Sequence, residues 1–153
     1  MQSLKGLERL SLREIDVPQL LKTIDISTPI GLRDRALIEL LIGTSASISI
    51  AIGVKVEDYF WRERRRWVRL QANGNQKEIP VNEPLKTYID EYIAAAGILD
   101  EKGSSLFRAA GRINGQLGTR QVRHADVLRM IRRRRVLART GRCLNPARPC
   151  SEQ

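Results

Sequence analysis

The sequence contains few of the residues from which metal and redox sites are built. It has two cysteines, Cys143 and Cys150, both near the C-terminus, and a single histidine, His124. A structural zinc site needs about four sulfur or imidazole ligands at short spacings, and no such set is present. We therefore expect no metal and no other cofactor, and we interpret both cysteines as incidental.

Long apolar runs are also missing. No stretch approaches the roughly 20 residues that a helix needs to cross a bilayer. Residues 1–10 hold no apolar segment long enough for a secretion signal. We expect a cytoplasmic protein without membrane association. A length of 153 residues suits one domain.

Acidic residues are scarce in the last part of the chain. Residues 119–153 contain ten arginines and only two acidic side chains, whereas residues 1–60 hold seven basic and eight acidic ones. The net charge of +10 is therefore concentrated near the C-terminus, with a second group of arginines at 62–69. Arginine pairs bidentately with phosphate, which favours a polyanionic partner. A merely solubilising surface is the alternative, but such surfaces usually mix both signs of charge.

Periodic apolar residues predict four helices. The first starts at a capping box at 11–14, or at Asp16, and runs to Ile24, where residues 28–31 break it. Residues 32–42 are apolar around most of the helical circumference, which indicates a central, buried helix. A third helix starts at Asn82 and Pro84, has a clear core-facing stripe and ends at Gly97. The last is expected from Gln121 to Leu137, with Thr119 as its cap.

A β-hairpin is expected between these helices. Residues 67–71 alternate in polarity, Asn73-Gly74 follows, and residues 79–81 form the return strand. Asn-Gly is a strong hairpin signal because both turn residues must accept a positive φ. Leu106-Phe107 is a candidate short strand. The predicted fold class is α+β, mainly helical, with a small antiparallel hairpin.

The order of these segments resembles the catalytic domain of the tyrosine recombinases, or phage integrases. Residues 31–38, GLRDRALI, are similar to the helix that opens this domain, and residues 44–49 occupy the place of its first active-site box. Residues 56–58, VED, precede the hairpin as they do in the family. The resemblance covers residues 11–137 and implies a truncated catalytic domain of this kind.

The resemblance also implies a chemistry that this sequence lacks. Family members attack a DNA phosphodiester with a tyrosine hydroxyl, and two arginines and a lysine stabilise the transition state. Ser47 stands at the position of the first arginine, and Asn73 at that of the hairpin lysine. Lys77 is close enough in sequence to replace this lysine, a question that the sequence leaves open. The His-x-x-Arg box and the nucleophilic tyrosine have no counterpart before the chain ends, so we expect no intact catalytic set.

Simpler structural roles are available for the remaining candidates. Ser47 can begin a helix, and Asn73 is explained as a turn residue. His124 lies on the apolar side of the last helix, which indicates a partly buried packing residue. Tyr88 and Tyr92 belong to the core-facing stripe of the third helix, and Tyr59 is expected in a loop.

The last helix carries the predicted DNA-binding surface. At about 100° per residue, Val127, Leu128 and Ile131 share one side and the arginines the other. Arg134 and Arg135 flank the apolar side and are expected to extend outward past it. The predicted DNA-binding residues are Arg120, Arg123, Arg129, Arg132, Arg133 and Lys77. Residues 62–66 form a second candidate patch, with a solvated turn as the alternative.

These features predict a DNA-binding remnant of a recombinase, with double-stranded DNA as its partner and no cleavage activity. Two alternatives stay open: a recombinase part completed in trans by another subunit, and an unrelated basic nucleic-acid-binding protein. We divide the chain into a domain at 1–137 and an irregular, disordered tail at 138–153, which we attribute to a shifted reading frame. The loss of later family helices is expected to expose apolar surface and to favour self-association.

Overall fold

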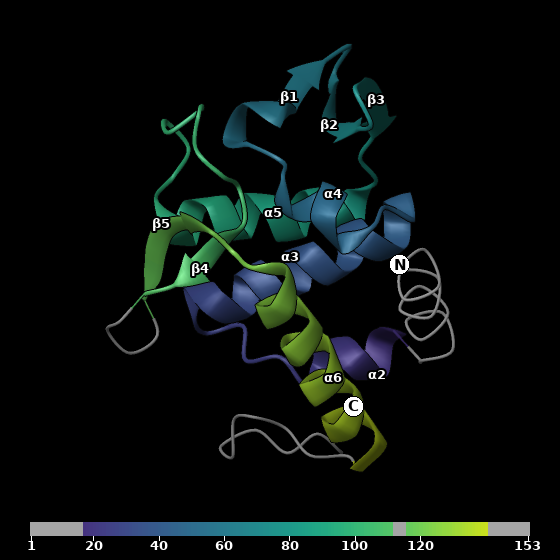
Figure 1. The fold of residues 1–153 in the computed structure, drawn as a ribbon, viewed down its shortest axis with the longest axis vertical. Coiled ribbons are helices and arrows are strands. Elements are labelled where there is room, and N and C mark those ends of the chain that lie inside the picture. The colour runs from purple at the N-terminus through teal and green to yellow at the C-terminus, as the bar shows by residue number, and fades with distance from the viewer. Residues whose placement is uncertain (1–16, 112–115, 141–153) are drawn as a thin grey trace.

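The structure, a computed structural model, describes residues 17–111 and 116–140 (Figure 1). Five α-helices and five strands in these ranges form the mainly helical α+β fold that the sequence predicts. A 3-10 turn, η1 (Val56–Asp58), precedes the first strand. The helices are α2 (Val17–Lys22), α3 (Pro29–Thr44), α4 (Ile48–Ile52), α5 (Glu83–Ala96) and α6 (His124–Thr140). The strands are β1 (Tyr59–Arg62), β2 (Arg65–Ala72), β3 (Asn75–Pro80), β4 (Arg108–Ala110) and β5 (Leu117–Gln121).

Helix α3 is the central, buried helix, as predicted, but it starts earlier than expected. The hydroxyl oxygen of Thr28 accepts a hydrogen bond from the amide of Gly31 at 3.0 Å, and Pro29 occupies the first helical position. Proline fits there because that amide would have no helical partner. Residues 28–31 thus lie after the end of α2, as predicted, but residues 29–31 also form the first turn of α3, so the predicted helix start at Leu32 was too late. Gly31 is required, because a Cβ at this position would lie 1.8 Å from the carbonyl oxygen of Asp25.

Helix α5 packs along α3 and agrees with its prediction at both ends. The side chain of Asn82 accepts from the amide of Leu85 at 3.0 Å, and Gly97 ends the helix with a φ of 67°. Glycine adopts this left-handed conformation most easily because it has no Cβ. The predicted stripe faces the core, where Tyr92 is fully buried and Tyr88 partly so.

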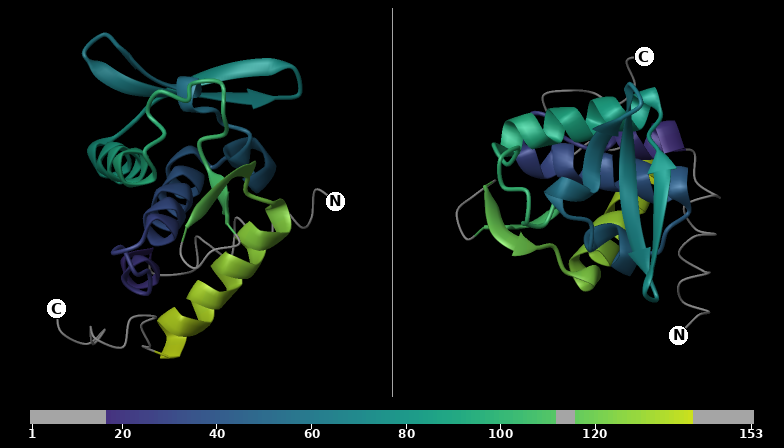
Figure 2. Two further views of the ribbon diagram at one scale, coloured as in Figure 1. Left: turned by 90° about the vertical axis from the view of Figure 1, so that its left-hand side faces the viewer. Right: turned by 90° about the horizontal axis from the view of Figure 1, so that it is seen from above.

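A three-stranded antiparallel sheet of order β1-β2-β3 covers one end of the helices (Figures 1 and 2). The predicted turn is confirmed, with φ values of 53° at Asn73 and 80° at Gly74. Strand β1 was not predicted, and Tyr59 lies in it rather than in a loop. Its turn to β2 uses Glu63 and Arg64, both with positive φ. Neither residue type is a turn signal, so the sequence offered no local evidence for this hairpin.

The segment before α6 differs most from expectation. Leu106 and Phe107 are buried, but the strand begins after them at Arg108. Thr119 lies inside β5 and caps no helix, because β5 pairs with β4 through the Arg108–Gln121 register. Strands β4 and β5 are short and show no periodic pattern in the sequence. Helix α6 therefore starts at His124. It also continues through residues 138–140, so the predicted tail does not begin at 138. The rest of the tail and the capping box at 11–14 lie outside the described residues.

Candidate nucleic-acid interface

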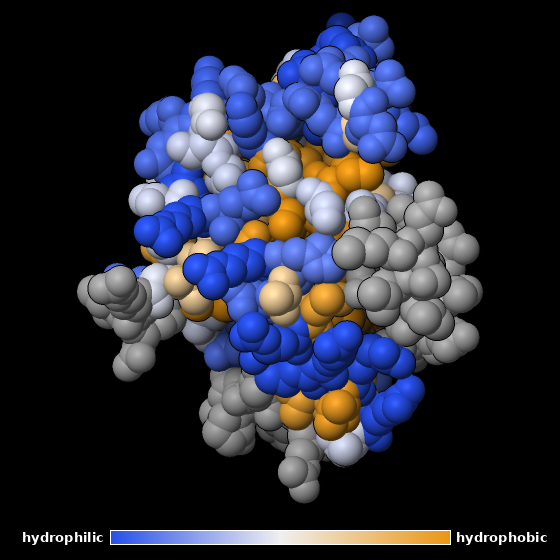
Figure 3. Space-filling view, viewed as in Figure 1, coloured by the Kyte–Doolittle hydropathy of each residue, from blue (hydrophilic) through white to orange (hydrophobic). Residues whose placement is uncertain are grey.

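Helix α6 presents a buried side and an exposed, arginine-rich side. Val127, Met130 and Ile131 belong to the core. The other side carries the predicted DNA-binding residues Arg129, Arg132 and Arg133, all of them exposed. Figure 3 shows hydrophilic side chains gathered over α6 and over the sheet, with apolar patches between them.

Arg134 does not belong to this surface, which corrects the expectation that it extends outward. Its side chain is only 3% exposed and lies against α3 and the end of α2. One terminal nitrogen donates to the carbonyl oxygen of Thr23 at 2.9 Å, and the other contacts Asp34 at 3.3 Å. Burial lowers the pKa of Arg134, and the Asp34 carboxylate acts in the opposite direction. Arg134 therefore stabilises the fold that holds α6 in place.

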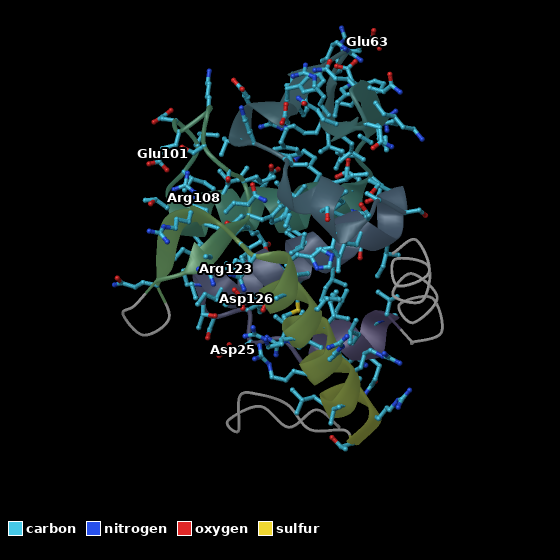
Figure 4. The ribbon with its side chains drawn as sticks, in the orientation of Figure 1. Asp25, Glu63, Glu101, Arg108, Arg123 and Asp126 are labelled. Carbon is cyan, nitrogen blue, oxygen red and sulfur yellow. The ribbon has the colours of Figure 1, made fainter. Side chains whose placement is uncertain are left out.

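Asp34 is the centre of this buried ionic network. Its carboxylate is fully buried and also accepts two hydrogen bonds from Arg33, the shorter at 2.7 Å. Arg33 donates in turn to the carbonyl oxygen of Arg108 in β4 at 2.7 Å. Arg108 pairs with Glu101 at 2.7 Å (Figure 4). The network thus ties α3 to α6, to the end of α2 and to the two-stranded sheet.

Two further predicted residues lie next to α6, and one does not. Arg120 is exposed in β5, and Arg123 is exposed in the short connection from β5 to α6, near Asp126 (Figure 4). Lys77 is exposed on β3, in the sheet at the other end of the domain (Figures 1 and 2). Five of the six predicted residues therefore lie on α6 or in the segment directly before it.

Most of these six charges are not neutralised by the protein itself. Arg129, whose side chain is 73% exposed, pairs with Asp126 at 3.2 Å. Within residues 17–111 and 116–140, the other five form no ion pair. Exposed cations without carboxylate partners are free to neutralise phosphate.

Several arginines of the β1–β2 hairpin have carboxylate or aromatic partners within the protein. Arg62 pairs with Glu78 at 2.8 Å, and Arg69 contacts both Glu78 and Asp58 at 3.4 Å. Arg62 and Arg65 also lie over the ring of Trp67, at 4.6 and 5.7 Å from its centroid. Internal partners thus occupy part of this second patch. It is an ordered hairpin and not only a solvated turn.

Helix α4 lies between the sheet and α6, because it contacts both β2 and α6. Ser47 precedes α4, is 5% exposed, and caps the helix by accepting from the amide of Ile50 at 3.4 Å. The structural role predicted for Ser47 is therefore confirmed, as is that of Asn73 in the hairpin turn. His124 is partly buried at the start of α6, also as predicted.

Lys77 shares a face of the sheet with the side chains that pack toward α4. It pairs with Leu70 across β2 and β3, and directly opposite residues of an antiparallel pair point to the same side. Leu70 is buried, and β2 contacts α4. Lys77 thus leaves the sheet on the α4 side.

Two of the three tyrosines use their hydroxyl groups in hydrogen bonds within the protein. The hydroxyl of Tyr59 donates to Asp90 at 2.7 Å, and burial and this carboxylate raise the pKa of Tyr59 far above its usual value. Tyr92 donates to the carbonyl oxygen of Leu106 at 2.7 Å, and burial raises the pKa of Tyr92 to about 12. The ring of Tyr88 lies beneath the guanidinium of Arg35, at 4.1 Å.

In the described ranges, no group of three or more His, Cys, Asp or Glu side chains is arranged to hold a metal ion. None of the helices there is both long and apolar enough to span a bilayer.

The sequence also matches a known protein family. Residues 11–140 match the phage integrase family. The chain belongs to this family, the tyrosine recombinases, as its segment order predicted.

Individual relatives match a shorter part of the chain. The tyrosine recombinase XerD of Corynebacterium glutamicum is 42% identical over 82 residues, which are 53% of this chain and 26% of that protein. XerD of Mycobacterium leprae is 41% identical over 66 residues, covering 42% of this chain and 20% of that protein. The tyrosine recombinase XerC of Rhodospirillum centenum is 35% identical over 101 residues, covering 65% and 29%. The chain thus spans about a quarter of the length of these relatives.

Proposed function

We propose that this chain binds duplex DNA through the exposed side of α6 and does not cleave it. The observation that carries the proposal is the set of exposed arginines on α6, among which Arg132 and Arg133 form no ion pair in the described part of the chain. Residues three or four apart on a helix lie about one turn apart, so successive side chains can reach successive phosphates. Arg120 and Arg123 extend the same surface at the start of α6.

Contacts of this kind supply affinity but little sequence preference. Arginine side chains on phosphates position a protein on the duplex, whereas sequence is recognised through base edges. The hairpin arginines support the proposal less well, because Glu78 and Asp58 already neutralise part of their charge. Lys77 is the member of the predicted set that belongs to a separate contact, on the α4 side of the sheet.

The first prediction is a steep salt dependence of duplex binding. If about four phosphates are contacted, the logarithm of the association constant falls with the logarithm of the salt concentration at a slope near −3.6, or about 0.9 per phosphate. Titrations of a labelled duplex of mixed sequence at several sodium chloride concentrations measure this slope. A duplex with an unrelated sequence serves as the control and is expected to give the same slope. A salt-independent affinity would contradict the proposal.

The proposed lack of cleavage follows from the residue at the first active-site position. A serine hydroxyl supplies neither a positive charge nor a bidentate fork for phosphate oxygens. The hydroxyl of Ser47 is moreover turned to its own helix, where it caps α4. Tyr59 and Tyr92 use their hydroxyls in hydrogen bonds within the protein, which makes either of them a poor nucleophile.

The second prediction is that the protein forms no covalent adduct with nicked suicide duplexes. We expect the same result after Ser47→Arg and Asn73→Lys are introduced together, because these changes leave the hydrogen bonds of Tyr59 and Tyr92 in place. Denaturing gels with end-labelled DNA detect any adduct, and an active recombinase on the same substrate is the positive control. A phosphotyrosyl link mapped to Tyr59, Tyr88 or Tyr92 would show that the proposal is wrong.

A further inference from the structure

The three-stranded sheet has an inner face, turned to the helices, and an outer face, turned away from them (Figure 2). Val68 and Leu70 of β2 are buried on the inner face. Side chains alternate along a strand, so Trp67 and Arg69 belong to the outer face. Phe60 of β1 lies directly opposite Trp67 and therefore on the same face. The described helices all lie on the inner side of the sheet and leave the outer face uncovered (Figures 1 and 2).

Aromatic rings and guanidinium groups alternate across the outer face. The guanidinium carbon of Arg69 lies 4.8 Å from the ring centroid of Phe60, and that of Arg62 lies 5.4 Å from the same centroid. Arg62 is also 4.6 Å from the ring centroid of Trp67, and Arg65 is 5.7 Å from it. The order is thus Arg69, Phe60, Arg62, Trp67, Arg65. We call this set of planar groups the arginine–aromatic row.

The protein holds the row in place. Glu78 on the neighbouring strand β3 accepts from Arg62 at 2.8 Å and contacts Arg69 at 3.4 Å. The indole N–H of Trp67 donates to the carbonyl oxygen of Arg62 at 3.0 Å. Phe60 and Trp67 are nevertheless partly exposed. A flat ligand therefore meets side chains that are already ordered, which lowers the entropy cost of binding.

Positive charge remains at the end of the row next to the hairpin turn. Arg65 is exposed and, like Arg64 in the turn, forms no ion pair within residues 17–111 and 116–140. Glu63 in the same turn is the acidic residue that opposes them. Glu78, the one acidic strand residue of the outer face, is already paired with Arg62. Two unpaired guanidinium groups against one carboxylate favour an anion such as phosphate at this end.

We propose that the outer face of the sheet binds single-stranded nucleic acid. Unpaired bases stack on the arginine–aromatic row, and the phosphates beside them contact Arg65 and Arg64. Bases of a single strand stack on aromatic rings and on guanidinium planes, while basic side chains follow the backbone. The sheet and α6 lie at opposite ends of the domain (Figure 1). This site is therefore separate from the duplex site proposed on α6, and neither depends on the other.

Other ligands would use fewer of these groups. In a duplex the bases already stack on one another, so a duplex would meet only the charges of the row. An acidic peptide would pair with Arg65 and leave the rings without a planar partner. A bilayer would need apolar side chains that project into it. Trp67 is instead only partly exposed and held in the row, and Gln71 and Gln76 beyond it are exposed and polar.

Oligonucleotides test the proposal. The probe is a fluorescein-labelled oligothymidylate of about twelve nucleotides, and its affinity for the full chain is measured by fluorescence polarisation. An abasic oligonucleotide of the same length carries the same phosphates. We expect it to bind at least about tenfold more weakly, because the stacking of the bases is lost. The matching oligouridylate is expected to agree with oligothymidylate within about threefold, and a larger difference would show whether RNA or DNA is the ligand.

Two pairs of residues on opposite faces of the hairpin locate the site. Trp67→Leu is expected to weaken oligothymidylate binding about tenfold. Trp61→Leu should change it less than about twofold, because Trp61 lies on the other face, beside a cavity of about 530 Å³ between β1 and the loop after α5. Arg65→Ala should weaken binding on the order of fivefold. Arg66→Ala removes the same charge from the inner face and should change it less than about twofold.

Two further measurements separate stacking from a structural role. The chain has two tryptophans, so the fluorescence of Trp61→Leu reports on Trp67. We expect oligothymidylate to quench this fluorescence and the abasic oligonucleotide to leave it unchanged. Thermal melts monitored by circular dichroism show that each variant is folded.

The triple variant of α6, with Arg129, Arg132 and Arg133 replaced by alanine, distinguishes the two proposed sites. It is expected to keep its affinity for oligothymidylate within about threefold while its duplex affinity falls. Loss of oligothymidylate binding in this variant, with none in Trp67→Leu, would assign single strands to α6 and overturn the sheet proposal alone. Equal binding of the abasic oligonucleotide would overturn it as well, because only charge would then be recognised. Displacement of oligothymidylate by phosphatidylglycerol vesicles would assign the outer face to a membrane surface.

Discussion

Replacing Asp34 by alanine is expected to lower the free energy of unfolding by about 3–5 kcal/mol, the cost of leaving buried charges without their partner. Asp34 is fully buried and is the carboxylate shared by Arg33 and Arg134. Without it, two buried guanidinium groups face each other with only carbonyl acceptors left. The loss also releases α6 from α3, which lie 100 residues apart in sequence at this contact.

Urea unfolding followed by circular dichroism measures this effect, since the free energy falls linearly with urea concentration. Asp126→Ala is the matched control on α6. Its ion pair with Arg129 is exposed, so its loss is expected to cost less than about 1 kcal/mol. Asp34→Asn, which keeps the shape and loses the charge, should fall between the two. An Asp34→Ala variant within 1 kcal/mol of the parent would mean that the network contributes little to the fold.

Replacing Arg129, Arg132 and Arg133 together by alanine is expected to remove most of the duplex affinity. If each contacts one phosphate, the slope of the salt dependence falls from near −3.6 to near −0.9. At about 0.1 M salt, the loss of these three contacts is expected to lower the affinity by roughly a few hundredfold. Each contact adds about 0.9 to the logarithm of the association constant for every tenfold decrease in salt below 1 M. Alanine maintains helix propensity, so α6 should persist in this variant.

The β1–β2 hairpin provides the comparison for this prediction. Replacing Arg62, Arg64 and Arg65 by alanine removes the same charge from the second arginine patch. Because Glu78 already pairs with Arg62, we expect the slope to change by less than about 1. The opposite result, with a flat slope in the hairpin variant and an unchanged one in the α6 variant, would place the DNA on the sheet. Equal losses in both variants would point to a diffuse electrostatic attraction.

Much of the local structure could be predicted because its cause is local. Asn73-Gly74 forms its turn because these two residue types accept positive φ, and the alternation on both sides needs no distant partner. Helix α5 followed from its apolar stripe, its Asn82 cap and the glycine that ends it. Strand β1 escaped prediction because Glu63 and Arg64 adopt positive φ against their own preference, which pairing with β2 enforces.

The same distinction applies to the candidate site. The exposed arginines of α6 follow from helical periodicity. That Ser47 occupies the position of the first active-site arginine is a prediction from the resemblance to the family. The cavity beside Trp61 could not be predicted, since it joins β1 to the loop after α5. Nothing in the local sequence relates those two segments.

By itself the sequence determined the family, the helical periodicity, the hairpin turn and the side of α6 on which Arg129, Arg132 and Arg133 lie. Only the tertiary structure decided which charged side chains are buried and which are exposed. On α6, Arg134 lies on the same helix face as the core residues Val127 and Met130. On α3, Asp34 lies on the same face as Leu37. Helical spacing alone does not distinguish a buried ion pair from a surface charge. Burying a charge costs much free energy unless an oppositely charged group packs against it. That partner is a property of the packed molecule, and here it joins α3 to α6.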